Sequence, residues 1–304
     1  MQAIRTDFQP MNKITTPIER TPSYKSSGII KAVMKNGEKV SVAQIDYQEF
    51  DEENFQYVFS PYWEIIDGLP ASVFQGIPGI DMDLRLKNYY RVNYTPTFIS
   101  ERTPSESRED TRELMDSVGL DYYDRFEWLL RTNRRAANDN LIVERRREEK
   151  VVRQFAPGIL SDMQYGDKVI VESMEAIADT AAGLTDGMFH ILVNGIDVVT
   201  QEGRVLVDMT TRSAMVPYMM TQRLMAYHER IANLRMGIEQ AKKDGKYTGR
   251  KPIEVDETML RQIAKELDVG IITVEEAMKR TKINSRSTFY RKLRKVKDPN
   301  CRIP

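Results

Sequence analysis

The chain has 304 residues, of which 41% are hydrophobic, and a formal net charge of zero. This length suffices for about two domains with a sizeable core. A net charge of zero excludes a protein that is basic throughout, but the positive charge is concentrated in roughly the last sixty residues, as in a chain with a separate basic module. The single cysteine, Cys301, cannot form an intrachain disulfide, which favours a reducing compartment.

No apolar run approaches the ~20 residues that a membrane span needs, and the N-terminal residues lack the apolar core of a signal peptide. We therefore expect a cytoplasmic protein that has no contact with a membrane. Two histidines and one cysteine are too few to favour a zinc site. We expect neither a metal nor a cofactor.

Residues 1–27 are rich in Thr, Pro, Ser and Lys without periodicity, which predicts a disordered arm. Short alternating runs then predict a small β-rich region over residues 28–92. Its expected strands are 29–34, 39–45 and 56–59, with a hairpin turn at 35–38. The aromatic residues of this region are interpreted mainly as core, with a binding surface as the alternative: Tyr57, Phe59, Tyr62 and Trp63.

From residue 93 onward, strands and helices are expected to alternate, which predicts an α/β domain over residues 93–243 with a parallel or mixed sheet. The expected strands are 94–101, 141–144, 168–172 and 197–200. The expected helices are 105–118, 122–131, 147–163, 184–193 and a long one at 205–243, interrupted only by Pro217. Methionines crowd the first half of the long helix. They indicate core or, as we favour, an oligomer interface: Met209, Met215, Met219, Met220 and Met225.

Two short helices joined by a tight turn are predicted over residues 273–297. Thr273 and Glu276 have the spacing of a capping box, and Asn284 or Ser285 can cap the second helix. The second helix should bury Phe289 and Leu293, and it has no acidic residue from 286 to 297. A solvated basic helix is the alternative, but the geometry, the cap and the absence of acids together favour DNA binding.

The side chains suited to DNA fall into three groups. Hydroxyls and one arginine in the first turn of the second helix can reach base edges in a major groove, and later cations can bind phosphates. Residues 245–252 precede the module as an extended basic arm that suits a minor groove. The candidate DNA-binding residues are Lys246, Arg250, Lys251, Ser285, Arg286, Ser287, Thr288, Tyr290, Arg291, Lys292, Arg294 and Lys295.

This order of features resembles the C-terminal DNA-binding domain of serine recombinases of the resolvase/invertase family. The resemblance is carried by Gly-Lys-Tyr-Thr-Gly-Arg-Lys-Pro at 245–252 and Ser-Arg-Ser-Thr-Phe-Tyr-Arg-Lys at 285–292, although the turn is one residue longer than usual. The long helix resembles the family's dimerisation helix. The resemblance implies a homodimer or higher oligomer on double-stranded DNA, with a helix-turn-helix domain at 244–297. It is weaker over residues 95–204 and does not cover 1–92.

The resemblance also implies that the recombinase chemistry has been lost. Active members attack a DNA phosphodiester with a serine and stabilise its charge with arginines. In the run from Gly166 to Asp179, Ala176 and Asp179 stand where the family has arginines. Near residue 100, Ser100 replaces an arginine and Arg102 replaces the serine. We therefore assign no catalytic residue.

Three functions remain open from the sequence. The first is a non-catalytic, site-specific DNA-binding protein of a phage or mobile element, acting in the bacterial host cell as a regulator or accessory factor. The second is a recombinase with a displaced nucleophile, for which Ser100, Ser105 and Ser107 are candidates. The third is a phage interaction or scaffolding protein that uses its N-terminal region.

Overall fold

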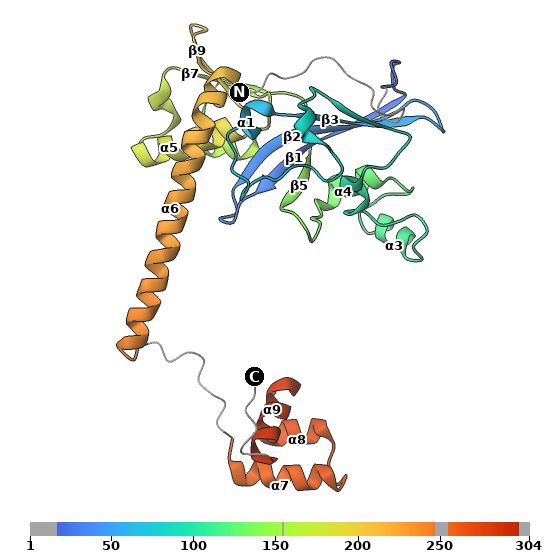
Figure 1. Cartoon of the computed structure of the whole chain (residues 1–304), viewed down its shortest axis with the longest axis vertical. Helices are drawn as coiled ribbons and strands as arrows, with labels where there is room; N and C mark the ends of the chain where they lie inside the picture. Colours follow the sequence, from blue (N-terminus) through green and yellow to red (C-terminus); the bar gives the residue numbers. More distant parts are fainter. Residues whose placement is uncertain (1–16, 154, 247–254, 298–304) are drawn as a thin grey trace. The chain divides into compact units, whose positions relative to one another are not determined.

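The computed structural model describes residues 17–153, 155–246 and 255–297 of the chain (Figure 1). The chain divides after Arg230 into two compact units. We call the described part of the first unit, up to Arg230, the body. We call the part of the second unit over residues 255–297 the C-terminal module.

The first sheet of the body is antiparallel throughout, with strand order β4-β3-β2-β1-β5. The three strands predicted in the β-rich region are confirmed, and so is the hairpin turn, where Gly37 has a φ of +90° that favours glycine. The strands are β1 (Tyr24–Val33), β2 (Lys39–Glu49), β3 (Phe55–Pro61), β4 (Tyr89–Val92) and β5 (Leu141–Arg145).

Strand β5 comes from beyond residue 92 but pairs with β1, from Ala32 opposite Leu141 to Gly28 opposite Arg145. The helix α4 (Arg125–Thr132) packs against β1 and β5, and it buries Phe126, Leu129 and Leu130 as predicted. Residues from both sides of position 92 therefore share one sheet and one hydrophobic core. Short helical segments complete this part of the body: α1 (Trp63–Ile66), a 3-10 turn at Met82–Leu84, α2 (Thr97–Ser100) and α3 (Thr111–Asp116).

The second sheet has the order β6-β7-β8-β9 and is mixed, which was one of the two predicted forms. Of its strands, only β7 and β8 were predicted, and the predicted strand 141–144 lies in the first sheet as β5. Its first three strands are parallel and the last is antiparallel. The helix α5 (Ala181–Val193) connects β7 to β8, and 3-10 turns lie at Pro157–Asp162 and Met174–Ile177. The strands are β6 (Val151–Val152), β7 (Lys168–Val171), β8 (Asp197–Thr200) and β9 (Val205–Val207).

Two predicted elements are wrong. The strand expected at 94–101 is replaced by α2, where Pro96 precedes the first helical residue and the adjacent Phe98 and Ile99 are both buried, so the burial does not alternate as in a half-exposed strand. The helix expected at 147–163 is replaced by β6 and the 3-10 turn. Pro157 begins that turn, and a proline is disfavoured in a helix interior because it has no amide hydrogen to donate.

Two further predictions need adjustment. Only α3 is helical within the predicted range 105–118. Strand β1 begins at Tyr24, inside the predicted disordered arm, because these residues pair with the end of β2. Residues 1–16 of that arm lie outside the described residues.

The helix α6 (Met209–Lys243) follows β9, so the long helix is confirmed except for its first residues. Pro217 lies inside it, where Gly68 comes close: a Cβ on Gly68 would lie 2.9 Å from the Pro217 nitrogen. A larger side chain at residue 68 would therefore push α6 away. The core interpretation of the methionines is confirmed for two of them, and the oligomer interface stays a prediction. Met219 and Met220 belong to the core, whereas Met209, Met215 and Met225 are exposed.

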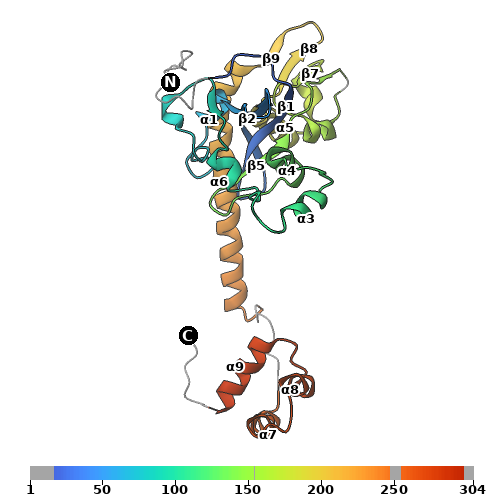
Figure 2. The same cartoon turned by 90° about the vertical axis from the view of Figure 1, so that its right-hand side faces the viewer.

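The C-terminal module consists of α7 (Glu257–Asp268), α8 (Val274–Thr281) and α9 (Arg286–Lys297), drawn in orange to red in Figure 2. It has a hydrophobic core of its own, to which all three helices contribute. The buried residues of this core are Leu260, Ile263, Ala264, Ile272, Ala277, Ile283, Phe289 and Leu293.

Candidate nucleic-acid interface

The start of α8 is fixed by the predicted capping box. The Thr273 amide donates to Glu276 Oε2 at 3.0 Å, and Thr273 Oγ1 accepts from the Glu276 amide at 3.3 Å. The hydrogen bond from the Thr273 backbone also lowers the pKa of Glu276. The helix ends at Thr281 and is capped by Lys282, whose left-handed φ of 54° turns the chain toward α9.

Ser285 caps α9. Its carbonyl accepts from the Phe289 amide at 2.9 Å, and its Oγ lies 3.5 Å from the Thr288 amide nitrogen. The same Oγ lies 2.9 Å from Ser287 Oγ. Of the two predicted caps, the structure therefore uses Ser285, and its hydroxyl already has partners within the module.

Helix α9 has one buried and one exposed face. Phe289 and Leu293 are buried in the module core, as predicted. Thr288 and Lys292, which were expected to face outward, are half-buried because they flank Phe289 and Leu293 on the helix surface. The exposed candidate residues on α9 are Arg286, Ser287, Tyr290, Arg291, Arg294 and Lys295.

Two candidate side chains already have an acidic neighbour. Arg286 Nη2 lies 3.3 Å from Glu275 Oε1 at the start of α8. Lys246, just beyond the end of α6, lies 3.6 Å from Asp244. Arg250 and Lys251 lie outside the described residues.

The exposed face of α9 carries guanidinium, ammonium and hydroxyl groups, so it is rich in hydrogen-bond donors and positive charge. Such groups match phosphate oxygens and the acceptors of guanine in a major groove. Arginine stems and the Tyr290 ring add apolar area for packing against a nucleic-acid backbone. The module therefore has the chemistry of a nucleic-acid interface on one helix.

The residues that the sequence resemblance aligned with the recombinase catalytic groups lie in the body, in different settings. Arg102 is buried and forms an ion pair with Asp139, and its Nη1 donates to the Phe98 carbonyl at 2.8 Å. Ser100 is exposed at the end of α2, where its Oγ donates to the Thr97 carbonyl at 3.2 Å. Arg102 thus holds α2 to the chain before β5.

The other positions from that comparison are exposed. Ala176 and Asp179 lie on the surface in and beyond the 3-10 turn that follows β7. Ser105 Oγ lies 2.9 Å from Ser107 Oγ on an exposed loop. These serines are reachable from solvent, but the hydroxyl group of each has the other as its neighbour.

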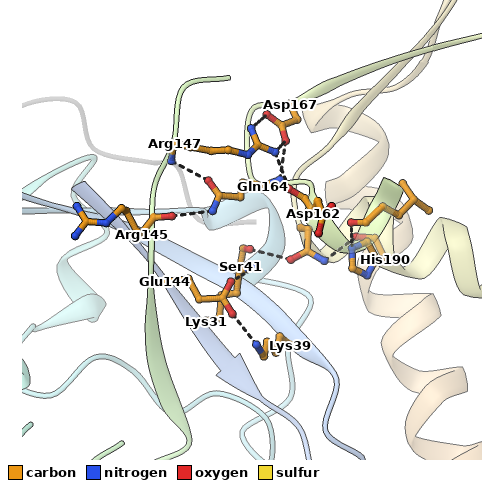
Figure 3. Close-up of polar contacts among 12 residues, drawn as sticks. Lys31, Lys39, Ser41, Glu144, Arg145, Arg147, Asp162, Gln164, Asp167 and His190 are labelled. Carbon is orange, nitrogen blue, oxygen red and sulfur yellow. Dashed lines mark hydrogen bonds and ion pairs between the residues drawn. The ribbon is translucent and has the colours of Figure 1, made fainter. Parts of the chain in front are cut away.

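Sequence reasoning missed a polar centre of the body, which joins the two sheets (Figure 3). The Asp167 carboxylate is fully buried, and it accepts hydrogen bonds from Arg147 Nη1 at 2.9 Å, the Lys150 amide at 2.8 Å and the Gln164 amide at 2.7 Å. Although burial alone would raise the pKa of Asp167, the Arg147 guanidinium and these amides hold it below its usual value. The Gly166-Asp167 pair was the only signal of this centre in the sequence.

A second set of charges lines a cavity of about 470 Å³ beside α5. Glu144 lies 2.7 Å from Lys31 and 2.6 Å from Lys39, and Figure 3 shows its contact with Lys39. These cations outweigh the effect of burial and lower the pKa of Glu144. On another wall, Arg223 lies 2.6 Å from Asp186 and 3.5 Å from Glu38. Cations and acids here neutralise one another, so we interpret them as structural.

His190 of α5 lies at the same cavity. Its Nε2 lies 2.6 Å from the Leu160 carbonyl oxygen, and since a carbonyl only accepts, Nε2 carries the proton. Burial lowers the pKa of His190, so the neutral ring is favoured.

Within the described residues, no group of three or more His, Cys, Asp or Glu side chains could hold a metal ion. Across the same residues, no helix combines the length and the apolar character needed to cross a membrane. The chain matches no model of a known protein family, and no curated protein is similar enough in sequence to be identified as a relative.

Proposed function

We propose that this protein binds double-stranded DNA at specific sites through its C-terminal module and does not cut it. The observation that carries the proposal is the division of α9 into a buried apolar face and an exposed face of cations and hydroxyls. A helix of this kind fits a major groove, with Arg286 and Ser287 at base edges and Arg291, Arg294 and Lys295 at phosphates.

The sequence resemblance adds the biological setting to this proposal. A degenerate serine recombinase that keeps its DNA-binding module would act as a regulator or accessory factor of a phage or mobile element. Arg102 supports the loss of chemistry, because an arginine buried against Asp139 supplies no nucleophile at that position. Asp179 supports it too, since an exposed carboxylate repels a phosphate instead of stabilising it.

We further propose that the protein is a homodimer through α6. Met215, Tyr218 and Met225 are exposed, and their spacing of three and seven residues places them on one face of the helix. Apolar side chains along one helix face are buried efficiently by a second copy of the same helix. A dimer would present two modules and so bind paired half-sites.

The test is to incubate the full-length protein with a genomic DNA library at physiological salt, sequence the retained DNA, and run part of each reaction on a denaturing protein gel. A recurring paired half-site without a covalent protein–DNA adduct supports the proposal. An adduct or nicked DNA would favour a recombinase with a displaced nucleophile, and Ser100, Ser105 and Ser107 would then be replaced in turn. If no DNA is retained, the result would favour an interaction or scaffolding protein that uses its N-terminal region.

A further inference from the structure

The Arg286 side chain, on the first turn of α9, is held by a carboxylate from the preceding helix. Its Nη2 lies 3.3 Å from Oε1 of Glu275, the second residue of α8. The two side chains are 68% and 77% exposed, and an exposed ion pair contributes little to folding stability. The consequence of this pair therefore lies in the behaviour of Arg286 and not in the stability of the module.

The contact restrains the arginine but leaves most of its hydrogen-bonding capacity unused. A guanidinium has five N–H donors, and the contact with Glu275 occupies Nη2. Reading guanine takes two parallel donors, one to O6 and one to N7. A side chain that is already restrained loses less conformational entropy when it binds, so the Glu275 contact favours docking of Arg286 on a base edge.

Glu275 also alters the choice between base and phosphate. A carboxylate next to the guanidinium repels phosphate oxygens, which are charged, more strongly than the neutral acceptors of guanine. The first helix of a helix-turn-helix crosses the DNA backbone, so the start of α8 is the place where this repulsion acts. The same carboxylate should thus weaken binding to arbitrary DNA.

We propose that Glu275 is a positioning residue that makes Arg286 prefer a guanine edge to a phosphate. The inference rests on the DNA-binding function proposed above and adds the device by which specificity is set. Ser287 belongs to the same turn: its Oγ lies 2.9 Å from Ser285 Oγ, so the hydroxyl group that accompanies Arg286 is restrained as well.

The experiment measures the affinity of the full-length protein for three kinds of duplex. These are the selected site, a series of variants of that site in which one guanine pair at a time is replaced, and an unrelated sequence. The variant is Glu275→Gln. The matched control is Glu257→Gln, which removes an exposed carboxylate from the first turn of α7 and so changes the module charge equally. Arg286→Lys keeps the charge but loses the bidentate fork. Melting curves of all variants verify that the module stays folded.

Glu275→Gln should lower discrimination at one guanine position by roughly three- to tenfold, part of the roughly 5- to 150-fold that a bidentate arginine–guanine contact contributes. It should also raise the affinity for the unrelated duplex. Glu257→Gln should leave discrimination at that position unchanged. In an Arg286→Lys background, adding Glu275→Gln should have no further effect on discrimination.

Equal effects of Glu275→Gln and Glu257→Gln would overturn the inference, because Glu275 would then act only through its charge. The proposed function would stand in that case. If the wild-type protein itself fails to retain DNA, the proposed function fails first and the inference with it. A module that melts early in Glu275→Gln would be compared through Glu275→Asp, which keeps the charge and shortens the side chain.

Discussion

In the body, Arg102 and Arg212 are almost completely buried and each is paired with an aspartate, whereas Arg291 and Arg294 of the C-terminal module point into solvent. A buried arginine paired with a carboxylate fixes how neighbouring segments pack, but the desolvation of both charges limits its contribution to stability. An exposed arginine on a helix without acids contributes little to packing and keeps its donors for a ligand. The setting of an arginine therefore decides its role.

The largest effect should follow from breaking a buried pair of the body. Asp139→Asn would leave the Arg102 guanidinium buried without its carboxylate, and such a change typically costs about 3–5 kcal/mol of unfolding free energy. Urea unfolding of the full-length protein would measure it. The matched control is Asp110→Asn, which breaks an exposed pair with Arg108 and should change nothing measurable. Equal losses in the two variants would contradict the structural role of Arg102.

The sequence predicted these two regions unequally well, for physical reasons. The last two helices of the module were predicted almost completely, because the capping box, the turn and the apolar spacing of Phe289 and Leu293 are local signals. In the body, strands β1, β2 and β3 were predicted by the same local reasoning. The pairing of β5 with β1 brings together residues more than a hundred positions apart, and no local pattern carries that information.

The errors within the body have the same origin. Arg147 was expected on a helix, but it follows strand β5 and binds Asp167. The two residues come together only in the folded chain. Pro96 and Pro157 are local signals against the strand and the helix that were predicted at these positions. On α9, Lys292 is half-buried because it packs against the module core, and the local sequence pattern does not predict this packing.

The next largest effect should be on DNA specificity, and it concerns Arg286, an exposed arginine of the module. Arg286→Ala should cost about 1–3 kcal/mol at the selected site and relax the preference at one base position, because a bidentate base contact is lost. Binding to unrelated DNA should change far less. Competition titrations with base-substituted duplexes would measure both quantities. A uniform loss on all duplexes would show that Arg286 contacts phosphate instead.

A smaller effect should follow from removing a phosphate contact. Lys295→Ala should weaken binding to every duplex alike and reduce the slope of log affinity against log salt by about 0.9, the value for one phosphate contact on duplex DNA. Lys292→Ala should behave in the same way but less completely, because that side chain is half-buried. Lys39→Ala, on the body, serves as the control and should leave the slope unchanged. If Lys295→Ala instead weakened binding at one base position only, Lys295 would contact a base edge and not a phosphate.

The smallest effect concerns the pH dependence of the body, and it separates its two histidines. Burial lowers the pKa of His190 in the folded chain, whereas the pKa in the unfolded chain is about 6.5. As the pH falls through that value, the unfolded chain takes up a proton that the folded chain does not, so stability is full at higher pH and decreases toward lower pH.

Melting temperatures of the full-length protein between pH 7.5 and 5.5 would measure this loss. The carboxylates Asp167 and Glu144 do not contribute in this window, because their pKa values are lowered in the folded chain and the ordinary values of about 3.9 for Asp and about 4.3 for Glu already lie below it. His190→Gln should flatten the dependence, since a glutamine amide can still donate to the Leu160 carbonyl and carries no titratable proton. His228→Gln removes an exposed histidine and should keep the full dependence. If the profile were flat in His228→Gln and unchanged in His190→Gln, burial of His190 would not be the cause of the pH dependence. The view that the body, unlike the module, uses its ionisable groups for packing would then be wrong.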